Sequence, residues 1–516
     1  MNVFITDTQR TNVSTFSKDA NVFGYRMFDT VLVIFTNDIF YNPIQNYCME
    51  YRTKPTLSLP EFVSVFENMI LHGNTTRWDE KDFLNLIQYY ISESLTEKAM
   101  EALDYALQFS SHHAEFYVIK IRLLMEEEDF KEANETLDIA LNLYPRHPEM
   151  QLMKIKVTAQ LGDYEKAFTM VDNCSDQMSL NSCVDLYLAE AYIYECMREY
   201  SLMYDKLRDV LTIDPKNEEA LEHIWLCVEW SRLYQESIEF HNNILNQDAY
   251  NYLAWFNLGH AYSCEGDYKN AIRSLEYSYI VNPEFKNGYL DCAELCCQVK
   301  EYKKALGIYQ ELLQRFGHQQ EYLVPAAECM LKLRKYALAK ECLIEALKLD
   351  QYIDDVYYLL GICYAREGNY SNAISSLIKA IRLDDRREEY YAELAYCYEK
   401  TKQYGKADFY YNKSTETGPE EETYWLAHIK FLMRRNKIEK ALDVLEEADE
   451  VTVGARLSYC KAACLYRLGR KQEAIECLDE ILPEDFDSHK IFFKMAPKGK
   501  TDRDIQSMIR YYSIEN

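Results

Sequence analysis

The sequence repeats about every 34 residues over most of its length, and this period limits the folds open to the chain. A small residue recurs at one phase, usually three positions after an aromatic residue. The twelve residues at this phase are separated by nine steps of 34, one of 36 and one of 33: Ala99, Ala133, Ala167, Met203, Ser237, Ala271, Ala305, Ala339, Ala373, Ala407, Ala441 and Ala474. A register held this far predicts an array of stacked units.

Each unit reads as two amphipathic helices. In the sixth unit the first helix has one apolar face with spacings of three and four: Trp255, Leu258, Gly259 and Tyr262. The pattern stops at Gly266-Asp267, starts again at Tyr268 and ends at Pro283, which cannot continue a helix. The small residue at position 259 allows the two helix axes to approach closely, toward the short end of the usual range of about 8–10 Å.

This pattern resembles the tetratricopeptide-repeat (TPR) family. The residues of the sixth unit that match the family pattern are Trp255, Leu258, Gly259, Tyr262, Tyr268, Ala271, Ser278 and Pro283. The resemblance implies an all-α fold, an α-solenoid (right-handed superhelix) of about twelve helix-turn-helix units with helical caps. We expect the units to begin near Glu80, Ala114, Pro148, Val184, Glu218, Tyr252, Lys286, Gln320, Asp354, Glu388, Glu422 and Ala455.

The ends of the chain do not follow the repeat. We expect an N-terminal capping helix region at 49–79, the repeat array at 80–487 and C-terminal capping helices at 488–516, with Thr501 as the N-cap of the last helix. Residues 1–48 form an irregular segment with aromatic and β-branched residues but no helical spacing. They either form a small extended or β-hairpin element or precede the true initiator, Met49.

Charge and composition exclude several classes of function. With 57 Lys and Arg against 84 Asp and Glu, the net charge is −27, which argues against broad binding to nucleic acids or to anionic membranes. No run of apolar residues is long enough to cross a bilayer. The start lacks the pattern of a secretory signal, so we expect a cytoplasmic protein whose 16 cysteines stay free.

Signatures of catalysis, cofactors and metals are absent from the sequence. It contains no phosphate-binding loop, nucleophile elbow, zinc-protease helix or dinucleotide fingerprint, and the repeats leave no room for a separate catalytic domain. The cysteines lack zinc-ribbon spacing, and several share the tenth position of their units, where a small apolar residue packs: Cys227, Cys329, Cys363, Cys397 and Cys464. We therefore expect no enzyme activity, no cofactor and no metal site.

The outward positions of the first helices are the candidate binding surface. The resemblance to TPR proteins implies that these helices line a concave groove that receives a peptide. Helical phase selects nine residues as peptide-binding candidates: Phe256, Asn257, His260, Asn287, Asp291, Glu294, Tyr358, Glu393 and Tyr396. Asn257 beside Phe256 is the best candidate for an anchor, because an amide can both donate to and accept from a peptide backbone.

These residues predict a non-catalytic scaffold or adaptor for protein–protein interaction. Because the candidate groove is acidic and aromatic, we expect a basic or amphipathic partner segment. The alternative is a regulatory or assembly subunit that self-associates through the ends of the solenoid. Its docking site would be a basic group in the C-terminal element: Lys490, Lys494, Lys498, Lys500, Arg503 and Arg510. The sequence does not determine the oligomeric state.

Overall fold

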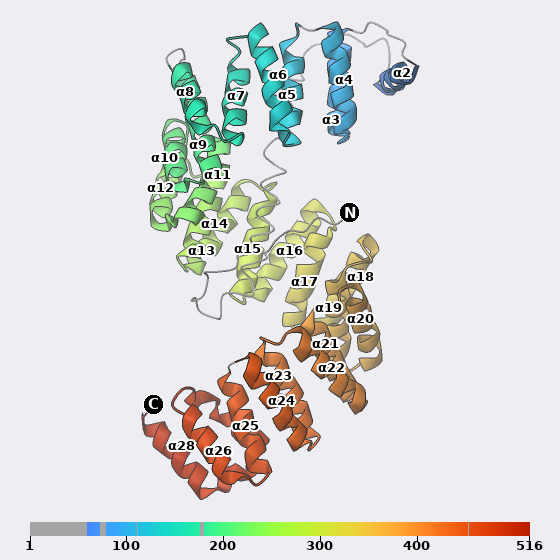
Figure 1. Cartoon of the computed structure of the whole chain (residues 1–516), viewed down its shortest axis with the longest axis vertical. Helices are drawn as coiled ribbons and strands as arrows, with labels where there is room; N and C mark the ends of the chain where they lie inside the picture. Colours follow the sequence, from blue (N-terminus) through green and yellow to red (C-terminus); the bar gives the residue numbers. More distant parts are fainter. Residues whose placement is uncertain (1–58, 73–78, 111, 176–179, 453, 516) are drawn as a thin grey trace. The chain divides into compact units, whose positions relative to one another are not determined.

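The computed structural model describes residues 59–72, 79–110, 112–175, 180–452 and 454–515, and every regular element in these ranges is a helix. Most of the helices form twelve consecutive pairs (Figure 1). The pairs are α3 (Glu80–Ser92) with α4 (Thr96–Phe109), α5 (Ala114–Glu126) with α6 (Phe130–Leu143), α7 (Pro148–Gln160) with α8 (Tyr164–Ser175), α9 (Leu180–Met197) with α10 (Tyr200–Ile213), α11 (Glu218–Ser231) with α12 (Tyr234–Gln247), α13 (Tyr252–Cys264) with α14 (Tyr268–Val281), α15 (Lys286–Gln298) with α16 (Tyr302–Phe316), α17 (Gln320–Lys332) with α18 (Tyr336–Leu349), α19 (Asp354–Arg366) with α20 (Tyr370–Leu383), α21 (Glu388–Lys400) with α22 (Tyr404–Thr417), α23 (Glu422–Arg434) with α24 (Ile438–Val451), and α25 (Ala455–Arg467) with α26 (Lys471–Ile481).

This architecture confirms the predicted all-α, stacked-hairpin fold. Eleven of the twelve first helices begin at the residue predicted from the repeat, and only α9 differs, beginning at Leu180 instead of Val184. The longer spacing in this unit therefore extends a helix at its N-terminal end. The chain divides into two compact units between Pro145 and Arg146, so that α2–α6 lie in the first unit and α7–α28 in the second.

The recurring small residues hold the two helices of each pair together. All twelve are buried, with 0 or 1 % of their surface exposed. Gly259 of α13 shows why size matters, because a Cβ atom there would lie 2.6 Å from Leu275 Cγ of α14. Gly361 of α19 has the same relation to Leu377 of α20. Close helix contact at these positions therefore depends on the absence of a side chain.

The turn inside each pair has a second recurring feature. One residue in all twelve turns has a positive φ, in the left-handed region: Ser94, Glu128, Gly162, Arg198, Arg232, Gly266, Lys300, Arg334, Gly368, Lys402, Asn436 and Gly469. This conformation ends the first helix with the backbone bonds of a C-terminal cap, as in the bond from Lys300 N to Cys297 O. Only four of the twelve are glycine, so most turns place an L side chain in a disfavoured conformation.

Helices also cover both ends of the array. At the N-terminal side, α2 (Leu59–His72) places Phe66 against Phe83 and Tyr105, with ring centroids 6.5 and 5.8 Å apart. At the C-terminal side, η2 (Phe486–His489), α27 (Lys490–Met495), η3 (Pro497–Thr501) and α28 (Arg503–Glu515) follow the last pair. Phe492 and Ile505 of this element are buried against the last repeats. The predictions for residues 1–48 lie outside the described residues.

The N-cap of the last helix differs from the prediction. Thr501 ends η3, and α28 begins two residues later at Arg503. Asp502 takes the capping role, because its Oδ1 accepts a hydrogen bond from Asp504 N at 3.1 Å. The prediction of Thr501 as N-cap is therefore wrong. Asp502 is held in place by Lys471 of α26, whose Nζ lies 2.9 Å from Oδ1.

Candidate peptide-binding face

The first helices of successive pairs contact one another, as α11 contacts α13 and α19 contacts α21. Their outward side chains therefore form a row that runs from pair to pair. We call this row the first-helix face. The nine residues predicted from the sequence lie on these first helices in two groups: six on α13 and α15, and three on α19 and α21.

The central group is built around His260 of α13. The imidazole ring lies 4.8 Å from Trp225 of α11 and 4.5 Å from Phe256, measured between ring centroids. Its Nε2 lies 2.9 Å from Asp291 Oδ2 on α15. Phe256 also contacts Phe285 at 5.0 Å. Three neighbouring first helices thus contribute to one aromatic and polar cluster, with His260 between an aromatic side and an acidic side.

Two more carboxylates lie near His260, Glu229 on α11 and Glu294 on α15. Burial raises the pKa of the half-buried Glu229 carboxyl, although His260 opposes the rise. Glu294 is exposed to water, yet the surrounding protein and the charge of Asp291 raise its pKa. Neither carboxylate forms an ion pair with any residue that the structure describes. Both negative charges therefore lack a paired cation among the residues that the structure describes.

This arrangement extends to the other carboxyls of the described ranges. Those with a raised pKa all lie on first helices: Glu126, Asp185, Glu229, Glu294 and Glu393. Those with a lowered pKa lie on second helices, in the turns that follow them or at the C-terminal cap: Asp248, Asp384, Asp408, Glu473 and Asp502. Within the described ranges, burial therefore raises the pKa of carboxyls only on first helices, although other carboxylates there are paired, as Glu399 is with Arg434.

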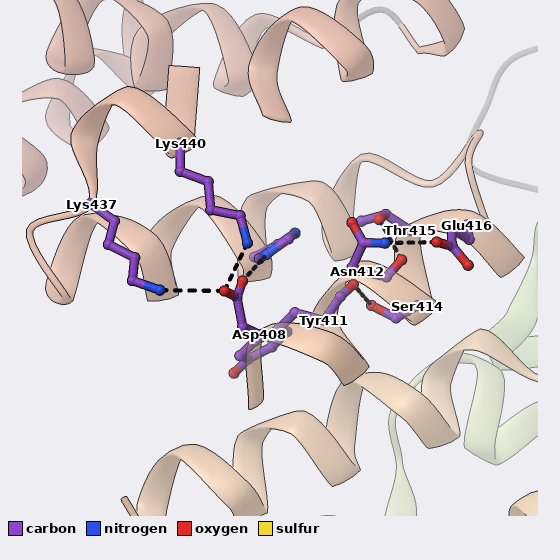
Figure 2. Close-up of polar contacts among 9 residues, drawn as sticks. Asp408, Tyr411, Asn412, Ser414, Thr415, Glu416, Lys437 and Lys440 are labelled. Carbon is purple, nitrogen blue, oxygen red and sulfur yellow. Dashed lines mark hydrogen bonds and ion pairs between the residues drawn. The ribbon is translucent and has the colours of Figure 1, made fainter. Parts of the chain in front are cut away.

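Asp408 of α22 illustrates the compensated kind (Figure 2). Its Oδ2 accepts from Lys440 Nζ at 2.7 Å, and Lys437 Nζ lies 3.4 Å away, both from the following pair. His428 Nε2 lies 3.0 Å from the other oxygen, Oδ1. Burial alone would raise the pKa of Asp408, but the hydrogen bonds from Lys440 and His428 outweigh it and hold the pKa below its ordinary value.

Asn257, the predicted peptide anchor, faces inward. Only 2 % of its surface is exposed, and its Nδ2 donates to Leu221 O of α11 at 2.7 Å. The amide therefore connects two repeats and is not open to a peptide, so Asn257 is not carried into the site proposed below. Asn287 is half-buried in the first turn of α15, and the structure gives it no part in the cluster around His260.

The second group has its own cations. Arg366 of α19 donates to Glu393 Oε1 at 2.9 Å, and its guanidinium lies 5.7 Å from the ring of Tyr396. Lys400 Nζ also lies over the Tyr396 ring, 5.1 Å from its centroid. Tyr358 contacts the ring of Tyr390 at 4.7 Å. The Glu393 carboxylate is therefore already paired with a cation, unlike the Glu229 and Glu294 carboxylates of the central group.

Sequence reasoning missed two residues of the central cluster, Trp225 and Glu229. Glu229 occupies an outward position of the fifth unit, so the helical phase that selected the other residues would have found it there too. Trp225 stands at the eighth position of its unit, where seven other units have Gly or Ala, as at Gly259. Its contact with His260 depends on the neighbouring repeat, which phase within one unit does not describe.

Family models support the repeat. Models described as "Tetratricopeptide repeat" match residues 120–170, 254–276 and 331–388. The chain is a tetratricopeptide-repeat protein. A model described as "Anaphase-promoting complex, cyclosome, subunit 3" matches residues 400–481, within the last TPR pairs. No curated protein matches the sequence.

Several solved TPR structures are similar to this chain. The yeast Tom70 structure is 14 % identical, with 81 % of this chain and 95 % of that chain covered and a TM-score of 0.39. A tetratricopeptide repeat protein from Parabacteroides merdae is 15 % identical, with coverages of 48 and 98 % and a TM-score of 0.39. The APC/C hetero-tetramer Cut9-Hcn1 is 13 % identical, with coverages of 88 and 99 % and a TM-score of 0.35. These likenesses are too weak to carry an argument about function.

Two kinds of feature are absent from the described ranges. No helix there is long and apolar enough to span a bilayer. In the same ranges, no group of three or more His, Cys, Asp or Glu side chains is placed to hold a metal ion.

Proposed function

We propose that this TPR protein is a non-catalytic interaction scaffold that binds a basic, amphipathic segment of a partner protein on the first-helix face of α11, α13 and α15. The observation that carries the proposal is the pair of carboxylates near His260, Glu229 and Glu294, which form no ion pair within the described part of the chain. Helix-repeat arrays present extended surfaces to partners, and a preformed surface lowers the ordering cost of binding. We further propose a cytoplasmic location, since the described cysteines are free.

The cluster offers two kinds of contact to such a segment. A Lys or Arg side chain of the partner would form ion pairs with Glu229 and Glu294, in partly desolvated surroundings where charge pairs are stronger than in open water. The half-buried ring of Phe256 would take an apolar side chain or the face of a cation. His260 is fixed by Asp291, so we assign it a positioning role between the two carboxylates.

A charge-removal variant tests this proposal. We expect Glu229→Gln with Glu294→Gln to weaken binding of a labelled Lys- and Leu-rich peptide about tenfold, as loss of about 1.4 kcal/mol would do. A matched control is Glu239→Gln with Glu341→Gln, which removes two exposed carboxylates from the second helices α12 and α18. Fluorescence anisotropy measures both. Equal binding by the two double variants would refute the site.

Folding of the test variant is not at risk on electrostatic grounds. A carboxyl whose pKa is raised in the folded state destabilises the fold when it ionises, so a neutral Gln should leave stability unchanged or higher. Circular dichroism before and after substitution checks this. Binding should also weaken as ionic strength rises from low to high salt, because the proposed contacts are partly exposed charges. Affinity that does not respond to salt would contradict the ionic part of the proposal.

A second candidate function is that of a subunit in a larger assembly, self-associating through the solenoid ends. Six cations of the C-terminal element are exposed and form no ion pair with the residues the structure describes: Lys490, Lys494, Lys498, Lys500, Arg503 and Arg510. The family model for an anaphase-promoting complex subunit over residues 400–481 also favours an assembly role. Light scattering over a concentration series tests self-association, and a monomer at every concentration would remove it.

A further inference from the structure

Two thiols from neighbouring repeats meet at one point of the array. Cys297 lies near the end of α15, and Cys329 lies in the later half of α17. Their sulfur atoms are 3.3 Å apart, and both residues are free cysteines. Cys329 is buried with 1 % of its surface exposed, whereas Cys297 is only half-buried. One residue of the pair is therefore partly open to solvent, whereas the other is buried.

The same contact recurs elsewhere in the array with different chemistry. The twelfth residue of one unit lies beside the tenth residue of the next, and in the last pairs these residues are Met433 and Cys464, with their sulfur atoms also 3.3 Å apart. Two intervening units also have a cysteine at the tenth position, Cys363 and Cys397. The twelfth residue of the unit before each is not a cysteine but Leu331 and Ala365, respectively. Only at Cys297 and Cys329 does the sequence place a thiol at both positions.

We propose that Cys297 and Cys329 form a site of reversible oxidation, in which hydrogen peroxide converts the two thiols into a disulfide between repeats. The peroxide transfers one oxygen to the sulfur of the half-buried Cys297, giving a sulfenic acid and one water. Cys329 sulfur then attacks Cys297 sulfur, so that the S–S bond forms and the S–O bond breaks. The released hydroxide takes the Cys329 proton and leaves as a second water. Two thiols and one peroxide thus give one disulfide and two waters.

The local environment favours the second step. The hydrogen bond between the two thiols lowers the pKa of Cys329 and raises the pKa of Cys297, so the thiolate is favoured on Cys329, the sulfur that attacks in the second step. The sulfur atoms need to approach by about 1.3 Å to reach the usual bond length near 2.0 Å. The product would join α15 and α17 covalently, whereas in the reduced protein both helices pack on α16. It would therefore fix the spacing of two successive first helices.

Peptide mapping of the peroxide-treated full chain tests the site. Trypsin releases the peptide 287–300, with Cys292, Cys296 and Cys297, and the peptide 316–332, with Cys329 as its only cysteine. We expect a disulfide-linked species of these two peptides to increase with dose of hydrogen peroxide and to disappear after dithiothreitol. Cys464, in the same kind of contact but beside Met433, is the internal control and should remain a thiol.

Two variants separate this pair from its neighbours. Cys297→Ser should abolish the linked species, whereas Cys296→Ser, one residue away on the same helix, should leave it intact. Circular dichroism confirms that each variant keeps its helices. The proposal would be overturned if no linked species formed, if it formed only in guanidinium-denatured protein, or if Cys297→Ser formed as much of it as the wild type. If the amides of α15 and α17 exchanged hydrogen at the same rate in the linked and reduced forms, the claim that the disulfide fixes the spacing of these two helices would be overturned.

Discussion

At the scale of single residues, His241 stands out from the pattern of its own array. The residue four positions after the recurring small residue is leucine in eight of the other eleven pairs: Leu103, Leu137, Leu207, Leu275, Leu343, Leu377, Leu445 and Leu478. In α12 it is His241, which is fully buried. Its Nδ1 lies 2.8 Å from Ser237 O, but Nε2 has no hydrogen-bond partner in the described structure. Burial lowers the pKa of His241 to about 4.

This residue makes the stability of the array depend on pH. Between about pH 6.5 and pH 4 the unfolded chain binds a proton at His241 that the folded chain does not, so stability falls as pH falls through this window. We expect His241→Leu to remove that loss. The stability gained by the variant over the wild type should be about 2 kcal/mol larger at pH 5 than at pH 7. Urea denaturation at the two pH values measures it.

A control for this prediction is His112→Gln, which removes an exposed imidazole and should leave the pH dependence unchanged. His428, also buried and with a lowered pKa, would account for pH dependence that remains in His241→Leu. If His241→Leu raised the free energy of unfolding by the same amount at both pH values, the assignment of the pH dependence to His241 would be contradicted.

At the scale of the helix pair, the left-handed residue in each turn carries strain that the sequence relieves only in some units. Gly162, Gly266, Gly368 and Gly469 adopt positive φ without a steric penalty. The other eight turns use residues with a side chain, among them Lys300 with φ of 66°. The fold tolerates this cost because the helices on both sides fix the turn.

Opposite substitutions at two equivalent turns test this strain. We expect Lys300→Gly to stabilise the array by about 0.5–1 kcal/mol, because a glycine adopts the left-handed conformation freely. Gly266→Ala should destabilise it by about 1 kcal/mol, although an added Cβ atom there has no neighbour within 4 Å and meets only backbone strain. Chemical denaturation followed by circular dichroism gives both values. Destabilisation by Lys300→Gly would show that the greater conformational entropy of glycine in the unfolded chain outweighs the relief of strain at this turn.

At the scale of the whole molecule, the net charge of −27 is distributed unevenly between kinds of helix. Among the described residues, carboxyls with a raised pKa lie on first helices, whereas carboxyls with a lowered pKa lie on second helices, in turns or at the C-terminal cap. On the first-helix face, Glu229 and Glu294 form no ion pair with any residue in the described ranges. As pH falls, carboxyls with a raised pKa take up protons before ordinary ones do.

This order of titration predicts how partner binding responds to pH. We expect the affinity for the Lys- and Leu-rich peptide to fall as pH decreases from 7 to 5, because Glu229 and Glu294 lose charge while the peptide stays cationic. Fluorescence anisotropy at a fixed ionic strength measures this. The double variant Glu229→Gln, Glu294→Gln should show a smaller pH dependence than the wild type. If both proteins responded equally to pH, other groups would be responsible.

Most of the fold could be predicted from the sequence, because a repeat array is built from local contacts. The buried contact between Gly259 and Leu275 joins residues of a single pair, so helical spacing and a fixed period were enough to find it. For the same reason eleven first helices begin at the predicted residues. Where the period is irregular, near the start of α9, the prediction was off by four residues.

What only the tertiary structure decided is which outward side chains of neighbouring pairs meet. Asn257 and His260 stand three residues apart on one helix, yet the first bonds inward to Leu221 and the second meets Trp225 and Asp291. A rotation of the helix by a fraction of a turn would reverse these roles, and sequence phase does not fix the rotation that closely. The sequence by itself therefore determined the array, its period and its charge. Packing between repeats determined which side chains of the first helices turn inward and which meet a neighbouring repeat.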